Sequence, residues 1–237
     1  MRPVNRFHPV VAWSIVGAGI GGVPIQHLVA QANPDPARFE KDIAAFEAED
    51  RASPPPPGAV VFVGSSSIRY WDTATAFPGV KTIKRGFGGS HVSDNIYFAD
   101  RTIFAYKPRA VVFYAGDADV AAGKNADQIF ADYKTFIAKV HSRLPGTPMV
   151  IIGIKPSPAH WEQMDAIRHT NTLVRTYVAG DRLVSFVDVV AALLGADGHP
   201  RPEFYSQNGL NLNDQGYAAW TRASRQAIED VMGKNAK

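Results

Sequence analysis

The sequence predicts an α/β domain, namely a three-layer α/β/α sandwich with a central parallel sheet. Apolar runs of strand length recur along the chain and stop at glycine or polar residues. Segments whose apolar residues have helical spacing lie between these runs. Strands that alternate with helices in this way form parallel sheets covered by helices on both faces.

The expected strands are short, and most are almost entirely apolar, as strands buried on both faces are. They cover residues 59–63, 80–83, 110–115, 149–154 and 183–187, of which residues 80–83 form the weakest pattern. The expected helices cover residues 37–50, 126–144, 161–178 and 216–232. Ligands bind beyond the carboxyl ends of the strands in such sheets, so we expect the functional residues there.

Composition excludes several classes of protein. The chain has 237 residues and no cysteine, which excludes disulfides, thiolate zinc sites and a cysteine nucleophile. Lys and Arg number 25 and Asp and Glu number 22, for a net charge of +3. Because no basic stripe is interleaved with aromatic residues, we expect no nucleic-acid partner. The pattern says nothing about oligomeric state.

Residues 1–32 have the order of a secretory signal peptide. Arg2 and Arg6 precede an uncharged stretch from Val10 to Ile25, and Ala30-Gln31-Ala32 matches a small-x-small cleavage site. We therefore expect an exported protein, periplasmic or secreted, whose folded domain comprises residues 33–237. An uncleaved N-terminal anchor is the alternative, and no membrane span is expected in the mature chain.

The same stretch contains Gly17-Ala18-Gly19-Ile20-Gly21-Gly22, which matches the G-x-G-x-x-G pattern of dinucleotide sites. Such a site needs a helix that begins at the glycines, because the helix N-terminus holds the pyrophosphate. Pro24 follows directly and no helical pattern appears before Asn33. The apolar part of a signal peptide is therefore the better interpretation.

Small and polar residues follow the strands where a site is expected. Gly64-Ser65-Ser66 follows the first strong strand and places a hydroxyl at the start of a helix, where backbone amides can bind a developing oxyanion. Taken alone, this segment is better explained by a serine N-cap. Three further segments favour a functional site, and they are Arg85-Gly86-Phe87-Gly88-Gly89-Ser90, Gly116-Asp117-Ala118-Asp119 and Asn208-Gly209-Leu210-Asn211.

Together the four segments resemble the sequence blocks of the SGNH, or GDSL-like, hydrolase family, in the right order and from about Ala37 to the C-terminal helix. The residues of the first two blocks are similar to those of a bacterial exported branch of that family. The resemblance implies a flavodoxin-like α/β/α fold. It also implies hydrolysis of acyl or acetyl esters through a serine acyl-enzyme, without metal or cofactor, on a small-molecule or glycan ester.

The resemblance also implies roles for particular positions. Ser66 holds the position of the nucleophile, and Gly89 that of a backbone N–H donor to the oxyanion. Ala118 stands where the family has an asparagine that also donates to the oxyanion. Asn208 and Asn211 stand where the family has the aspartate and the histidine of its catalytic triad.

These departures bear on the chemistry. Ser65 replaces the aspartate of the first block. A serine hydroxyl is a weak nucleophile until a base accepts its proton, and a carboxamide such as Asn211 cannot act as that base. Asn208 has no imidazolium to stabilise, and Ala118 removes a donor whose loss costs ~10²–10³ in rate. Because loss of key triad members costs ~10⁶ in kcat, we expect activity near background.

Two histidines are candidates for a substitute base. His91 lies two residues after Gly89, and His199 lies in a loop before the last block. A lone loop histidine is more often solvated or a capping group, so we expect neither to restore activity. Trp71 and Trp161 could line a groove, although aromatic residues at the ends of elements more often belong to the core.

Two functional hypotheses follow. The first is an exported SGNH-type ester hydrolase with strongly impaired activity. The second is a non-catalytic pseudohydrolase that binds a ligand or partner through the remnant pocket. The replacements at Ala118, Asn208 and Asn211 are also what an engineered inactive variant would carry, and the sequence does not separate drift from design.

Overall fold

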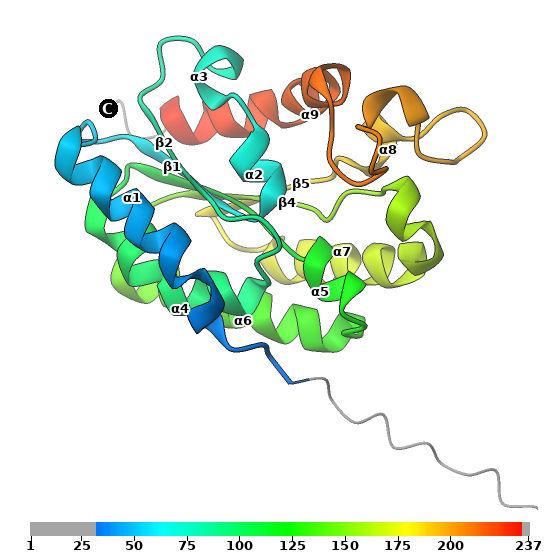
Figure 1. Cartoon of the computed structure of the whole chain (residues 1–237), viewed down its shortest axis with the longest axis horizontal. Coiled ribbons are helices and arrows are strands. Elements are labelled where there is room, and N and C mark those ends of the chain that lie inside the picture. Colours follow the sequence, from blue (N-terminus) through cyan, green and yellow to red (C-terminus); the bar gives the residue numbers. More distant parts are fainter. Residues whose placement is uncertain (1–31, 234–237) are drawn as a thin grey trace, which may run out of the picture.

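The apolar runs form one five-stranded sheet in the computed structural model, which describes residues 32–233 (Figure 1). The strands are β1 (Val60–Gly64), β2 (Thr82–Gly86), β3 (Ala110–Tyr114), β4 (Met149–Ile152) and β5 (Val184–Val187). All neighbouring pairs are parallel and the order is β2-β1-β3-β4-β5. The carboxyl ends of all strands therefore meet at one edge of the sheet.

Helices cover both faces of this sheet, which confirms the predicted three-layer α/β/α sandwich (Figure 1). One face carries α1 (Glu40–Ala52), α4 (Val92–Thr102), α6 (Ala126–Arg143) and α7 (Met164–Val178). The other carries α2 (Ser66–Tyr70), α3 (Thr73–Ala76), α8 (Val190–Leu193) and α9 (Asp214–Gly233). The short α5 (Asp117–Ala121) follows β3, and 3₁₀ turns span Pro36–Phe39, Phe104–Tyr106, Pro158–Gln163 and Pro202–Phe204.

The central strands β1, β3 and β4 are almost entirely apolar because the sheet is buried on both sides there. Along β1, Val61 and Val63 pack with the core under α4, α6 and α7, whereas Val60 and Phe62 pack with the core under α9. All four side chains are fully buried. Successive side chains of β1 therefore point to opposite faces of the sheet, as in any strand. The residue types do not reveal this alternation, because both faces are apolar.

Three expectations about elements need correction. The weak strand is Thr82–Gly86 and not 80–83, since this edge strand exposes Lys84 and lacks a continuous apolar run. The helix expected from residue 161 is α-helical only from Met164, after a 3₁₀ turn. Helix α4 was not expected, because its first turn contains Ser93, Asp94 and Asn95, residue types typical of turns.

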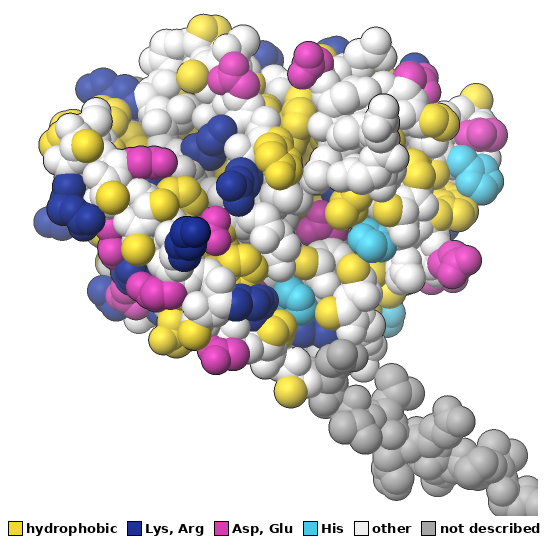
Figure 2. Space-filling view, in the orientation of Figure 1, with side chains coloured by type: hydrophobic (Ala, Val, Ile, Leu, Met, Phe, Trp, Pro, Cys, Tyr) yellow, Lys and Arg dark blue, Asp and Glu magenta, His cyan; other side chains and the backbone are white. Residues whose placement is uncertain are grey.

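The expected leader and the glycine pattern at residues 17–22 lie outside the described residues, except for Ala32. Within residues 32–233, no helix is long and apolar enough to span a membrane. Figure 2 shows Lys and Arg side chains interspersed with Asp and Glu over the α1 side of the molecule.

Candidate active site

The turn after β1 brings Ser66 to the carboxyl edge of the sheet. Gly64 has a φ of 144°, and a Cβ there would lie 1.7 Å from the backbone oxygen of Tyr114 on β3, so glycine is required. The Ser65 N–H donates to that same oxygen at 3.0 Å. Ser66 is then the first residue of α2 and is partly exposed. Its hydroxyl is therefore accessible at the start of a helix, as the sequence predicted.

The glycine turn after β2 passes beside Ser66. The Phe87 N–H donates to the Gly64 carbonyl at 3.0 Å, which ties this turn to the end of β1. A Cβ on Gly88 would lie 3.8 Å from the Ser66 Cβ. Gly89 follows with a φ of 79° and is exposed. The predicted oxyanion donor thus belongs to the turn that is in contact with the serine.

The end of β3 supplies the third segment. Gly116 has a φ of 113°, and a Cβ there would lie 2.6 Å from Ile154 Cδ1. Ala118 lies in the first turn of α5, is partly exposed, and has its N–H bonded to Asp117 Oδ1 at 3.0 Å. The side chain of Ala118 is a methyl group, so this position offers no side-chain donor to an oxyanion.

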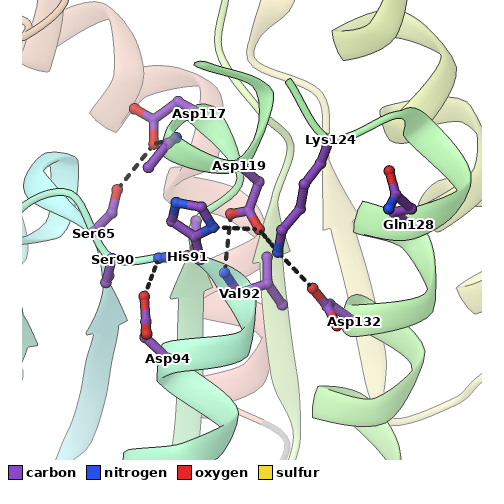
Figure 3. Close-up of polar contacts among 12 residues, drawn as sticks. Ser65, Ser90, His91, Val92, Asp94, Asp117, Asp119, Lys124, Gln128 and Asp132 are labelled. Atoms are coloured by element: carbon purple, nitrogen blue, oxygen red, sulfur yellow. Dashed lines mark hydrogen bonds and ion pairs between the residues drawn. The ribbon is translucent and has the colours of Figure 1, made fainter. Parts of the chain in front are cut away.

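Asp117 joins three strand ends through a buried polar network, of which Figure 3 shows the contact with Ser65. The Ser65 hydroxyl after β1 donates to Asp117 Oδ1 at 3.2 Å. The Lys155 ammonium after β4 lies 3.0 Å from Asp117 Oδ2 and 3.4 Å from the Tyr114 hydroxyl. The side chains of Lys155 and Asp117 are 0% and 7% exposed. Burial of two charged side chains costs less when they lie beside each other, as these two do.

The electrostatics of this network favour the ion pair. Burial by itself disfavours the Asp117 carboxylate, but the Lys155 ammonium, the Ser65 hydroxyl and the Ala118 N–H outweigh it. The pKa of Asp117 is therefore lowered from its usual value. Asp117 is a carboxylate at neutral pH and holds the segment before Ala118 in place.

A second buried network lies beside the first one (Figure 3). The Asp119 carboxylate is fully buried, accepts the Val92 N–H at 3.0 Å, and pairs with Lys124 at 2.6 Å. Lys124 also bonds Asp132 at 3.0 Å, and His91 Nδ1 lies 3.4 Å from Asp119. Asp119 thus joins the start of α4 to α5 and, through Lys124, to α6.

The loop before α9 carries the last two predicted positions. Asn208 Oδ1 accepts the N–H groups of Leu210 and Asn211, both at 3.0 Å, so this side chain closes a local turn. The Asn211 carbonyl accepts from the Ser206 N–H at 2.8 Å and the Ser206 hydroxyl at 2.9 Å. Asn211 Oδ1 is buried without a hydrogen-bond partner among residues 32–233.

The fold brings this loop to the side of α2 on which Ser66 lies. The Tyr217 hydroxyl on α9 donates to the Ser67 carbonyl at 2.9 Å. Tyr70, one helical turn after Ser66, lines a hollow of about 310 Å³ together with Asn211 and Tyr217. The five predicted positions are thus gathered at one edge of the sheet, although they come from four separate segments.

Neither candidate histidine bonds Ser66 within the described part of the chain. The buried His91 imidazole faces Asp119 (Figure 3), and His199 is exposed with its ring centroid 4.7 Å from that of Trp161. Trp71 belongs to the core, being 1% exposed. No group of three or more His, Asp or Glu side chains among residues 32–233 is arranged to hold a metal ion.

Sequence reasoning missed Lys155 and Lys124. Both are lysines in polar or proline-rich loops, where solvent exposure is the ordinary expectation. The only signal in the sequence is position, because Lys155 follows the apolar run 149–154 at a predicted strand end. Their burial depends on carboxylates that are distant in the sequence or on another turn, so it is a tertiary property.

The protein is thus an α/β/α protein with a parallel sheet. An accessible serine follows β1, and glycine turns and a C-terminal loop lie at the same edge of the sheet. A sequence model described as the GDSL-like lipase/acylhydrolase family matches residues 64–219. This match covers more than half of the chain, and the protein belongs to that family.

Individual relatives agree with this assignment. The chain is 24% identical over 183 residues to human platelet-activating factor acetylhydrolase IB subunit alpha1, a match that covers 74% of this chain and 78% of that protein. A GDSL-like lipase structure from Bacteroides thetaiotaomicron superposes with a TM-score of 0.67 at 20% identity, covering 80% of this chain and 98% of the other. An acetylxylan esterase from Geobacillus stearothermophilus, in a catalytic mutant form, gives 0.62 at 14% identity, with coverage of 73% and 95%. The two structural matches show the shared fold.

Proposed function

We propose that the protein carries an SGNH-type serine ester hydrolase site for acyl or acetyl esters in which turnover is strongly impaired. Ser66 is the nucleophile position, and Gly89 is the backbone donor position. The observation that carries the proposal is the chemistry of Asn211, a carboxamide at the place of the base.

An intact site of this kind works in two steps. The serine Oγ attacks the ester carbonyl carbon while its proton passes to the base, and backbone and side-chain N–H groups stabilise the oxyanion. The C–O bond to the alcohol breaks, and the base returns the proton to the departing oxygen. Water then attacks the acyl-enzyme, and its proton passes through the same base to release the acid and the free serine.

Three groups in this sequence of steps are missing from the present chain. Asn211 cannot accept and return a proton near neutral pH. The Asn208 oxygen already accepts two backbone N–H groups and carries no charge to stabilise a cationic base. Ala118 has no donor for the oxyanion. Because triad losses are non-additive, we expect a residual rate near background rather than the product of the single effects.

Acetyl esters are the substrate class that the relatives favour. The human relative is named for acetylhydrolase activity, and the Geobacillus stearothermophilus structure is an acetylxylan esterase. Both names describe hydrolysis that releases an acetyl group, from platelet-activating factor and from acetylxylan respectively. The transfer of this class to the present chain belongs to the proposal.

A non-catalytic binding role is the second candidate. The hollow of about 310 Å³ beside Asn211 favours it, because a pocket can hold a ligand without a catalytic base. In this case the chain is a pseudohydrolase, whether by drift or by engineering, and an ester binds without turnover.

The deciding experiment measures hydrolysis of p-nitrophenyl acetate by the parent, by Ser66→Ala, and by the triple reversion Ala118→Asn, Asn208→Asp, Asn211→His. We expect the parent and Ser66→Ala to be equally close to background and the reversion to be active. A parent that is robustly active and loses its activity with Ser66→Ala contradicts the impairment. A reversion that folds and stays inactive contradicts the assigned roles.

We also propose that the protein is exported, periplasmic or secreted, on the pattern of residues 1–32 alone. The test is N-terminal sequencing of the exported protein. Cleavage after Ala32 leaves Asn33 as the first residue, whereas retention of residues 1–32 in a membrane fraction indicates the anchor instead.

A further inference from the structure

A cleft between α2, α3 and α9 lies next to the hollow that contains Asn211. It has a volume of about 590 Å³, and Tyr70, Thr75, Asp214, Tyr217, Arg222 and Arg225 are among its lining residues. This volume lies within the ~300–1,000 Å³ typical of small-ligand sites. We call it the α2–α9 cleft. Tyr70, Asp214 and Tyr217 also line the hollow that contains Asn211, so the two spaces adjoin.

We propose that the α2–α9 cleft binds the sugar units of an uncharged oligosaccharide ester. The ester-bearing unit lies at Ser66 and Asn211, and further units extend along the cleft towards Arg225. The position of the ester rests on the proposed function, whereas the recognition of the sugar rests on the cleft itself.

The aromatic residue at the junction supports a sugar. Tyr70 lines both spaces and is 55% exposed, so its ring is available to a ligand in either of them. A pyranose ring presents an apolar face of C–H groups and a rim of hydroxyls. A rigid aromatic ring with a polar hydroxyl matches both parts of such a ligand, since it covers the apolar face and can still form a hydrogen bond.

The wall beyond Tyr70 is held in place before any ligand binds. The Tyr217 hydroxyl is fixed to the Ser67 carbonyl at 2.9 Å, and burial raises its pKa well above its usual value, so it stays a donor. The Trp71 indole N–H donates to the Thr221 hydroxyl at 3.0 Å. A wall fixed in this way loses little conformational entropy when a ligand binds, and this raises the affinity of an open cleft for its ligand.

Charged groups with unused hydrogen-bonding capacity point to hydroxyls as ligand groups. Asp214 and Arg222 form no ion pair or side-chain hydrogen bond with other described residues. The carboxylate is an acceptor and the guanidinium a donor, and a sugar hydroxyl can serve both. Arg225 is already engaged by Glu229 and by the Ala76 carbonyl, so it forms the boundary of the cleft and not its principal contact.

The same charges disfavour an acyl chain as the occupant. Asp72, Asp214, Arg222 and Arg225 all line the cleft. An alkyl chain placed against them would remove water from charged groups without replacing its hydrogen bonds, which is unfavourable. The two acidic and two basic residues balance one another, so the cleft has no net charge with which to select an anionic or cationic sugar.

Isothermal titration calorimetry on the full chain carrying Ser66→Ala tests the proposal without turnover. The probes are acetylated xylotetraose, cellotetraose and, as the acyl arm, octanoate. We expect acetylated xylotetraose to bind and octanoate not to bind. Tyr70→Ala should weaken binding by about tenfold or more, in line with the loss of an aromatic anchor. Tyr97→Ala on α4 is the matched control, because Tyr97 is 62% exposed and does not line the cleft.

A second variant guards against a trivial loss of folding. Tyr70→Trp keeps an aromatic ring, and we expect it to bind at least as tightly as the parent. Binding of neither oligosaccharide, binding of octanoate that is lost with Tyr70→Ala, or equal losses in Tyr70→Ala and Tyr97→Ala would each overturn the proposal. If the oligosaccharide binds but the triple reversion stays inactive, the proposed catalytic roles fail and the sugar cleft stands. If the reversion hydrolyses p-nitrophenyl acetate and no sugar binds, the proposed catalytic roles stand and the sugar cleft fails.

Discussion

The buried Ser65–Asp117–Lys155 network and the loop of residues 206–211 lie at the same edge of the sheet but differ in how they are held. The network is almost inaccessible to solvent, and both of its charges are paired with each other across segments 38 residues apart. In the loop, Asn208 is exposed and its side-chain bonds reach no further than Asn211. A change in the network therefore affects the whole fold, whereas a change in the loop affects mainly the chemistry.

This contrast explains how the chain can lose its reactive groups and still keep the family fold. Ala118, Asn208 and Asn211 are all partly or fully exposed, so their replacement removes little packing. Four sets of substitutions test this contrast between the network and the loop, from the largest expected effect to the smallest.

Removal of the Lys155 charge should have the largest effect. Lys155→Met leaves the Asp117 carboxylate buried without its partner, and we expect a loss of about 3–5 kcal/mol in the free energy of unfolding. Urea denaturation measures this loss. The control is Lys139→Met, whose side chain is 28% exposed and pairs with Asp100 at 3.2 Å, and which should cost less than about 1 kcal/mol. Similar losses in the two variants would contradict the contrast.

Restoration of the oxyanion donor should affect activity only when the base is present. In the background Asn208→Asp, Asn211→His, addition of Ala118→Asn should raise kcat on p-nitrophenyl acetate by ~10²–10³. In the parent background the same substitution should leave the rate near background, because no base activates Ser66. Equal gains in the two backgrounds would mean that the groups do not act as one unit.

Acid should reduce the contribution of Asp117 to stability. The folded pKa of Asp117 is lowered, so its carboxylate stabilises the folded state above the usual aspartate pKa of about 3.9, and this contribution is lost as the pH falls towards the folded pKa. We expect Asp117→Asn to cost about 1–3 kcal/mol at pH 7, less than Lys155→Met, because the asparagine oxygen can still accept a hydrogen bond from the Lys155 ammonium. The difference from the parent should narrow below about pH 4. A difference that is constant from pH 7 to pH 3 argues against a charged Asp117.

The loop should give the smallest changes in stability. Asn208→Asp keeps an oxygen that can accept the Leu210 and Asn211 N–H groups, so we expect stability to change by less than about 0.5 kcal/mol. Asn208→Ala loses both bonds and should cost about 1 kcal/mol, as the loss of a capping group does. Thermal unfolding of the two variants and the parent measures these losses in stability. A loss in either variant greater than that of Lys155→Met would contradict the contrast between the loop and the network.

Much of the fold could be predicted because its signals are local. The apolar runs that became β1, β3, β4 and β5 are nearly continuous, and burial on both faces leaves that pattern in the sequence itself. The edge strand β2 and helix α4 were placed wrongly or missed, since β2 alternates buried and exposed residues and α4 begins with buried polar side chains. Asp94 there bonds the His91 N–H and pairs with Arg38, 56 residues away.

The site was predictable in part for a related reason. Glycines and serines at strand ends are required by local backbone geometry, as the 1.7 Å approach at Gly64 illustrates, so they appear as short motifs. Short motifs do not predict whether Trp71 lies in the core or in a groove. It is buried and also lines the α2–α9 cleft, because helices α2 and α9 approach each other only in the folded chain.

The sequence by itself determined the fold class, the family resemblance and the three replaced positions, because strand periodicity and turn glycines act over a few residues. Only the tertiary structure decided that Lys155 and Lys124 are buried, that Tyr70 and Asn211 line one hollow, and that Asp117 joins three strand ends. The physical reason is that burial and ion pairing depend on which distant segments pack together. A lysine has the same sequence signature in solvent as it has beside a buried carboxylate.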